Sequence, residues 1–105
     1  MSLKNPKPIR WHIAARDDFA QIIASIALER PRAAERLAQR ILHRVEMLAE
    51  FPYFGPVCPY YRKARQLIHG NYIVYYTVHR NEVVVRAVVH GARLFRSRWL
   101  RRPDE

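Results

Sequence analysis

The sequence is poor in cysteine and glycine and has no long hydrophobic run. Cys58 is the single cysteine, which excludes an internal disulfide and a zinc site built from several cysteines. No segment approaches the ~20 apolar residues of a membrane-spanning helix, and Met1–Trp11 lacks the apolar run of a signal peptide. We therefore expect a cytoplasmic protein without membrane contact. The length of 105 residues, with no repeat, predicts a single domain over residues 1–105.

Acidic residues are scarce in the second half of the chain. Residues 51–103 hold ten Lys or Arg and one acid, Glu82, whereas residues 1–50 hold nine Lys or Arg and six acids. The net charge of +10 is therefore segregated. A field of one sign favours polyanionic partners such as nucleic acid or an acidic protein segment, although a generally basic, soluble protein is the alternative.

The first half of the chain predicts a short strand and two helices. Residues 1–8, with two prolines, form a loose lead-in, and Ile9–Ala14 suits a strand. Apolar residues at helical spacing predict a first helix over residues 16–28, with Asp17 and Asp18 at its N-terminus. Pro31 opens a second amphipathic helix of about 20 residues, which ends at Phe51-Pro52. These two helices predict a hairpin that packs on an apolar surface.

The second half predicts three strands. Residues 52–63 form a loop, and β-forming residues then fill Ala64–His69, Tyr72–Val78 and Val83–His90, with turns at Gly70-Asn71 and Arg80-Asn81. The fold class is therefore α+β, in the order β-α-α-β-β-β, with the N-terminal helical hairpin packed on one face of a small antiparallel sheet.

A tight turn at Arg80-Asn81 fixes the expected register of the last two strands. Val78 then opposes Val83, Tyr76 opposes Val85, Val74 opposes Ala87 and Tyr72 opposes Val89, so these eight residues should face the helices. The other face should be mixed and cationic, with Gln66, Tyr75 and Arg86 in one row and His90 beyond them. We expect this face to lie uncovered and to meet a partner, the alternative being a solvated sheet face.

Two further features follow from this pattern. Arg65 falls on the apolar face, where its charge requires snorkelling or a carboxylate such as Glu46 or Glu50. Residues 94–105 form an arginine-rich tail, in which Arg96 and Arg98 lie between Phe95 and Trp99. Arginine interleaved with aromatic residues binds phosphates and stacks on bases, but such aromatics equally pack on a domain.

Several short patterns, taken in order, resemble the RelE/ParE superfamily of bacterial toxins. They are Asp18 with Ile22 and Ile26, Pro31-Arg32-Ala33-Ala34, Phe51-Pro52 with Gly55, Arg65-x-Leu67, Tyr72–Val78, Val83-x-Val85 and Val88-Val89-His90-Gly91-Ala92-Arg93. The resemblance covers roughly residues 9–93. It implies the toxin of a type II toxin–antitoxin system, also called a plasmid stabilisation system, bound by a cognate acidic antitoxin. A homo-oligomer or a toxin–antitoxin hetero-oligomer is compatible with it.

The superfamily has two main activities, and the residues favour one of them. RelE-like members cut messenger RNA on the ribosome with lysines and arginines, whereas ParE-like members inhibit DNA gyrase. In this sequence Gln66 and Ile73 stand where the resemblance implies a lysine and an arginine, Arg93 matches a retained arginine, and Trp99 lies near a family tyrosine. RNA cleavage needs a base, an acid and cationic stabilisation, which Ile73 does not supply. The ParE-like activity is therefore favoured.

The expected site residues follow from this resemblance and from the charge pattern. An RNase site would use Arg93, His90 and Arg86, but without a clear second proton-transfer group, so we lean against an enzyme. Binding of a partner or of nucleic acid is expected at Gln66, Tyr75, Arg86, His90, Arg93, Arg96, Arg98 and Trp99. No metal or cofactor motif is visible. Three functions stay open: a gyrase inhibitor, a ribosome-dependent mRNA endonuclease, and a non-toxic basic domain that binds nucleic acid.

Overall fold

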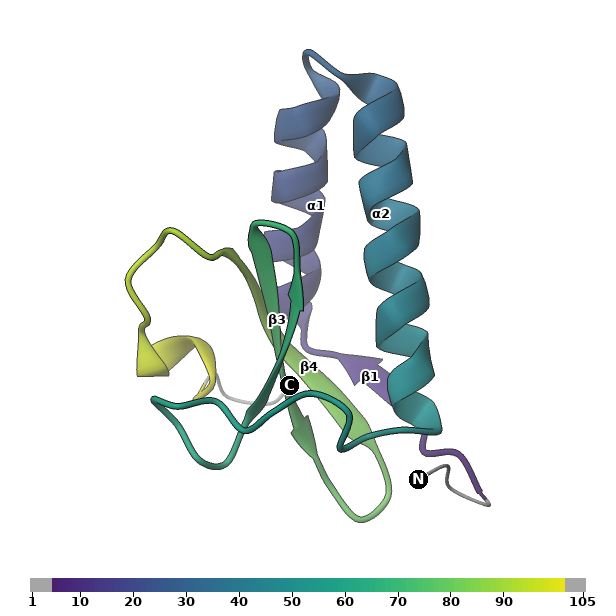
Figure 1. The fold of residues 1–105 in the computed structure, drawn as a ribbon, viewed down its shortest axis with the longest axis vertical. Coiled ribbons are helices and arrows are strands. Elements are labelled where there is room, and N and C mark those ends of the chain that lie inside the picture. The colour runs from purple at the N-terminus through teal and green to yellow at the C-terminus, as the bar shows by residue number, and fades with distance from the viewer. Residues whose placement is uncertain (1–4, 102–105) are drawn as a thin grey trace.

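Two helices and four strands follow one another in the predicted order, in a computed structural model that describes residues 5–101 (Figure 1). The elements are β1 (Ile9–Trp11), α1 (Ile13–Ala27), α2 (Pro31–Glu46), the 3-10 turn η1 (Met47–Ala49), β2 (Arg65–His69), β3 (Tyr72–Val78), β4 (Val83–His90) and the 3-10 turn η2 (Ser97–Trp99). The α+β class is confirmed. The expected lead-in and tail extend into residues 1–4 and 102–105, which lie outside the described residues.

Helix α1 begins three residues earlier than the sequence predicts. The Nδ1 atom of His12 accepts a hydrogen bond from the Ala14 amide, 3.0 Å away, and so caps the first turn. The predicted strand is shortened accordingly and ends at Trp11. Asp18 consequently lies beyond the first turn. Its carboxylate instead accepts a hydrogen bond from the Val88 amide on β4, 3.1 Å away.

Helix α2 begins at Pro31 as predicted, and η1 continues it to Ala49, close to the expected end. Pro31 suits this start because its missing N–H would have no partner in the first turn. Ala34, Ile41 and Val45 are buried on one side of the helix. Four arginines recur every fourth residue on another side, at Arg32, Arg36, Arg40 and Arg44. The predicted helical hairpin is therefore present.

The sheet is mixed, which corrects the predicted antiparallel sheet. Its strand order is β1-β4-β3-β2, and β1 pairs with β4 in parallel. The long connection through both helices allows the parallel pairing, whereas tight turns make β2, β3 and β4 antiparallel. Strand β4 lies inside the sheet, and all residues from Val83 to Val89 are buried. A strand that is covered on both faces is typically rich in apolar residues, and Arg86 is the one charged residue of this buried segment.

Half of the predicted register is wrong, because β4 contains a β-bulge. Val78 opposes Val83 and Tyr76 opposes Val85 as predicted, but the register then shifts between Tyr75 and Tyr76. Tyr75 opposes Ala87, Val74 opposes Val88, and Tyr72 opposes His90. One extra residue in β4, Arg86, causes the shift. The expected row is also corrected, because Gln66 pairs with Tyr75 but Ala87, not Arg86, continues the row.

The loop before β2 explains how Arg65 lies beside apolar residues. Its Nη1 donates to the carbonyl oxygens of Gly55 (2.8 Å) and Tyr53 (3.3 Å), and its guanidinium lies 5.0 Å from the centroid of the Tyr53 ring. Backbone carbonyls and an aromatic ring thus fill the role expected of a carboxylate. Gly55 also donates to the Tyr76 hydroxyl at 2.9 Å, and a Cβ there would lie 2.4 Å from the Gln66 carbonyl oxygen.

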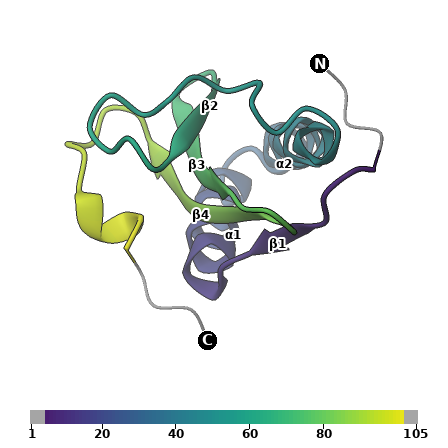
Figure 2. The same cartoon turned by 90° about the horizontal axis from the view of Figure 1, so that it is seen from below.

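Two hydrophobic cores lie on opposite faces of the sheet. The two helices cover one face, and the loop before β2 and the C-terminal segment lie on the other (Figure 2). The helix-side core is made by residues of α1, α2 and the sheet, namely Ala15, Ile41, Val45, Leu48, Leu67, Val74, Tyr76, Val83, Val85 and Val88. The outer core joins sheet residues to the loop and the C-terminal segment, namely Cys58, Ala64, Tyr75, Ala87, Val89, Trp99 and Leu100.

The outer core corrects the expectation of an uncovered cationic face. Residues 58–64 and 95–100 of the same chain cover Tyr75, Ala87 and Val89. Trp99 is only 7% exposed, so this part of the arginine-rich tail packs on the domain. The alternative in which the tail aromatics pack on the domain is therefore the correct one.

Replacement of Trp99 tests this covering layer. Trp99→Ala should lower the free energy of unfolding by ~3 kcal/mol, because truncating a buried aromatic side chain removes its burial and leaves a cavity. Denaturant unfolding measures the change. Arg98→Ala, at the exposed neighbouring position, is the control and should change the stability by less than ~0.5 kcal/mol. Equal stability of the two variants would contradict the packing of the C-terminal segment.

Candidate functional site

Four aromatic rings form a continuous cluster at the outer core. Phe95 lies at its centre, with ring centroids 5.1 Å from Tyr60, 5.6 Å from Tyr75 and 6.1 Å from Trp99. Tyr75 and Trp99 close the cluster with centroids 6.4 Å apart. Tyr75 and Trp99 are buried, Phe95 is half-buried, and Tyr60 is exposed. The cluster thus runs from the sheet to the surface.

Exposed cations lie in the two chain segments that carry Tyr60 and Phe95. They are the side chains of Arg62, Lys63, Arg93, Arg96, Arg98 and Arg101. The guanidinium of Arg93 lies 6.0 Å from the Trp99 ring centroid, within the range of a cation–π contact. The two segments that carry these cations, residues 60–63 and 93–101, contain no acidic residue. The expected cationic surface exists, but it lies on the covering layer and not on the sheet.

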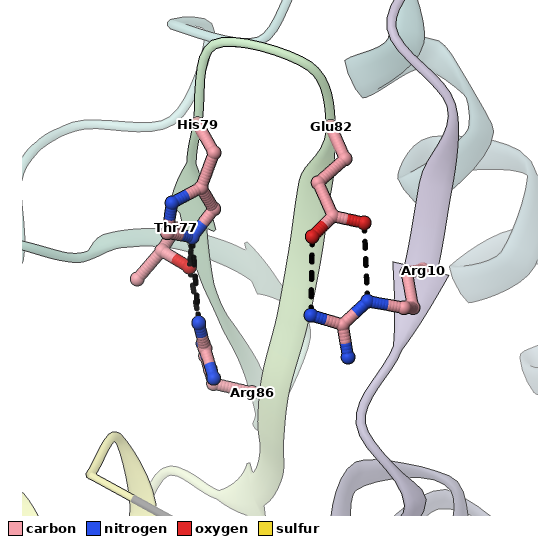
Figure 3. Close-up of polar contacts among 5 residues, drawn as sticks. All are labelled: Arg10, Thr77, His79, Glu82 and Arg86. Atoms are coloured by element: carbon pink, nitrogen blue, oxygen red, sulfur yellow. Dashed lines mark hydrogen bonds and ion pairs between the residues drawn. The ribbon is translucent and has the colours of Figure 1, made fainter. Parts of the chain in front are cut away.

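A polar network of buried Thr77 and Arg86 with exposed His79 occupies the outer face near the β3–β4 turn (Figure 3). Arg86, 8% exposed, donates from Nε to the Thr77 hydroxyl at 3.0 Å, and its Nη2 lies 3.3 Å from Nε2 of His79. The Thr77 hydroxyl lies 2.7 Å from the same His79 nitrogen. A guanidinium only donates hydrogen bonds, so Nε2 of His79 accepts in its contact with Arg86. The bulge places Arg86 in this network.

An ion pair next to this network joins β1 to the turn between β3 and β4 (Figure 3). Arg10 donates from Nε to Oε1 of Glu82 at 3.0 Å and from Nη2 to Oε2 at 3.1 Å. The pair is partly exposed, so it contributes at most ~1 kcal/mol to stability. It also engages the single acid of residues 51–101, which is therefore directed toward Arg10.

The structure divides the expected binding residues into two groups. Tyr75, Arg86 and Trp99 are buried, and Gln66 is half-buried in the sheet. The exposed group consists of His90, Arg93, Arg96 and Arg98. Tyr75 and Trp99 belong to the outer core that holds the covering layer, while the four exposed residues face solvent.

His90 and Arg93 lie at one end of a groove between α1 and β4. The groove has a volume of about 290 Å³ and includes Asp18, Ile22, Ile26 and Tyr72 in its lining. His90 Nδ1 accepts a hydrogen bond from the Ala92 amide at 3.1 Å, and its ring meets the Tyr72 ring edge-on at 5.3 Å between centroids. Strand β1 pairs only with residues 83–85 of β4, so the groove follows the part of β4 that β1 leaves uncovered.

The structure does not bring together the three residues of the hypothetical RNase site. Arg86 and His90 are four residues apart on β4, roughly 13 Å along the strand. Arg86 bonds Thr77 on the outer face, whereas His90 opposes Tyr72, which packs against the helix-side core. His90 and Arg93 therefore share a groove from which Arg86 is absent.

Sequence reasoning missed Tyr60, Arg62 and Lys63, which it assigned only to a loop. The signal was an aromatic pair followed directly by two basic residues, Tyr60-Tyr61-Arg62-Lys63. This run gave no hint that Tyr60 would contact Phe95, 35 positions away.

Two structural features are absent from residues 5–101. No group of three or more His, Cys, Asp or Glu side chains is placed to hold a metal ion in that range. None of the helices in the same range is long and apolar enough to cross a bilayer.

The chain is similar to known toxins in sequence pattern and in fold. The family described as ParE toxin of type II toxin-antitoxin system, parDE, matches residues 9–95. The chromosomal ParDE system from P. aeruginosa has a TM-score of 0.71 at 18% identity, covering 80% of this chain and 95% of that one. The RelBE2 toxin–antitoxin complex from Mycobacterium tuberculosis has a TM-score of 0.61 at 18% identity, covering 89% and 100%. No curated protein sequence matches the chain.

Because two tyrosines are buried, we expect the free energy of unfolding to fall at high pH. Burial raises the pKa of Tyr75, and Cys58 and Tyr60 raise it further. Burial also raises the pKa of Tyr76, although the Gly55 amide and Arg65 act in the opposite direction. Above pH 10 the unfolded chain loses these protons while the folded chain retains them, so the free energy of unfolding should fall as pH rises.

Denaturant unfolding between pH 9 and 11 measures this effect. Tyr75→Phe removes one of the two protons that the folded state retains, so the variant should lose less stability with rising pH than the wild type. Identical pH dependence in both proteins would contradict the role of burial at Tyr75.

Proposed function

Since the chain belongs to the ParE toxin family of type II toxin–antitoxin systems, we propose that it inhibits DNA gyrase by binding and does not cut nucleic acid itself. The observation that carries the proposal is the exposed cationic surface beside a buried framework. Arg93, Arg96 and Arg98 project from a segment that Trp99 and Leu100 anchor. A rigid, positively charged surface favours rapid association with a negatively charged complex such as a topoisomerase with its DNA.

The arrangement of proton-transfer groups supports binding over RNA cleavage. His90 faces the α1 groove, while Arg86 is engaged with Thr77 and His79 on the other face. Gln66 and Ile73, half-buried in the sheet, carry no charge. A RelE-like endonuclease would need a base, an acid and cations around one phosphate. This alternative therefore requires a rearrangement that gyrase binding does not.

Gyrase supercoiling reactions test the proposal. The purified protein should cause cleaved DNA to accumulate, and Arg93→Gln/Arg96→Gln should weaken this effect by at least tenfold, because it removes two exposed charges. Arg30→Gln/Arg32→Gln is the matched control, since it removes two exposed charges at the far tip of the helical hairpin (Figure 1). It should inhibit gyrase as the wild type does. Normal supercoiling together with cut transcripts in a translating extract would instead establish the RelE-like activity.

We also propose that a cognate antitoxin binds the surface formed by α2 and β2. Arg36 and Arg40 are exposed on α2, and Arg44 donates to the Ile68 carbonyl at the edge strand β2. An apolar pocket of about 160 Å³ lies beside this edge, lined in part by Met47 and Phe54. An acidic amphipathic segment would place apolar residues in the pocket and carboxylates on the arginines.

Reversal of two of these charges tests the antitoxin contact. Arg36→Glu/Arg40→Glu should weaken binding to the acidic protein of the adjacent reading frame by at least tenfold, because like charges would then face each other. Titration calorimetry measures the affinity, and Arg96→Glu/Arg98→Glu is the matched control, because it reverses two exposed charges on the C-terminal segment. Unchanged affinity of Arg36→Glu/Arg40→Glu would place the antitoxin elsewhere on the toxin.

A further inference from the structure

Tyr60 presents an aromatic ring to solvent while the ring stacks on Phe95. Its side chain is 70% exposed although its ring stacks on Phe95, with centroids 5.1 Å apart and planes 26° apart. Phe95 is in turn held edge-on by Tyr75 and Trp99. One face of the Tyr60 ring therefore rests on the outer core, and the other face is left to solvent. A ring positioned in this way loses little conformational entropy when a planar group stacks on it.

The charged residues that adjoin Tyr60 and Phe95 in the sequence are all basic. Arg62 and Lys63 follow Tyr60 in the sequence, Arg96 follows Phe95, and all three side chains are exposed. Residues 60–63 and 93–101 together carry six basic and no acidic residues. A ligand bound over Tyr60 would thus meet cations from two segments that lie far apart in the sequence.

We propose that Tyr60, Arg62, Lys63 and Arg96 form a platform that binds single-stranded nucleic acid. An unpaired base would stack on the Tyr60 ring, and the flanking cations would bind the phosphates. A duplex fits less well, because its bases are already stacked on one another and only its phosphates would be bound. The platform shares Arg96 with the surface proposed for gyrase, but its binding to an oligonucleotide would hold whichever target the toxin inhibits.

The exposed ring favours nucleic acid over an acidic peptide. Carboxylates would pair with Arg62, Lys63 and Arg96 but would leave the face of Tyr60 unused. Base stacking on an aromatic ring is tolerant of sequence, since every base has a π face. The platform should therefore bind DNA and RNA single strands with little preference for sequence.

Fluorescence anisotropy with labelled oligonucleotides tests the platform. The probes are single-stranded dT and rU oligomers of about 20 nucleotides and a DNA duplex of the same length, titrated with the purified full chain at low salt. At least one single strand should bind more tightly than the duplex, and the comparison of dT with rU identifies the class of nucleic acid. Equal or tighter binding of the duplex, or no binding of any probe, would overturn the proposal.

Variants separate stacking from charge. Tyr60→Ala should weaken binding roughly 5- to 100-fold, whereas Tyr60→Phe, which retains the ring, should bind as the wild type does. Tyr60→Leu gives the same test while keeping an apolar contact with Phe95. Arg62→Gln/Lys63→Gln should reduce the slope of log K against log salt by about 1.4, because two phosphate contacts are lost.

Two controls decide between this platform and general charge attraction. Arg30→Gln/Arg32→Gln removes the same charge at the hairpin tip and should leave the salt slope unchanged. Polyglutamate at equal charge concentration should displace the oligonucleotide poorly. Wild-type affinity of Tyr60→Ala, equal effects of the two double variants, or efficient displacement by polyglutamate would each overturn the proposal.

Discussion

The extra residue in β4 determines which side chains point to each face of the sheet. Without the bulge, strict alternation would direct Ala87 and Val89 toward the helices and Val88 away from them. The register shift reverses this arrangement, so Val88 joins the helix-side core while Ala87 and Val89 join the outer core. A shift of one residue moves side chains to the opposite face because the period of a strand is two residues. The bulge also accommodates Arg86, whose guanidinium bonds Thr77 and His79.

The outer core in turn determines where the exposed basic side chains lie. Trp99 and Leu100 anchor the C-terminal segment on the sheet, and the arginines between and around the aromatic residues are then directed to solvent. Cys58 and Ala64 anchor the preceding loop on the same face, which brings Tyr60 to Phe95. Two basic segments that are separated by β2, β3 and β4 in the sequence thus become neighbours. Burial of apolar side chains, and not attraction between charges, holds these cations together against their mutual repulsion.

This organisation suits a toxin of the ParE family, whose proposed action depends on binding. The helix side and the outer side of the sheet are separated by β4, which is buried on both faces. The antitoxin proposed for the α2–β2 side and the target proposed for the C-terminal segment would therefore use different surfaces. The two proposed surfaces share no residue. The antitoxin would therefore neutralise the toxin by enclosing it or by blocking the target sterically.

The sequence by itself determined the helices, the strands, the turns and the sign of the charge. These features follow from local periodicity, from Pro31 and from the turn residues, each of which acts over a few positions of the chain. The tertiary structure decided the parallel pairing of β1, the bulge at Arg86 and the covering of the outer face. These features depend on contacts between distant residues, such as Asp18 with Val88 and Tyr60 with Phe95. The alternation of residues along a strand does not reveal one inserted residue. The sequence of an aromatic tail is the same whether the tail is free or packed, because the residues against which it packs come from the rest of the fold.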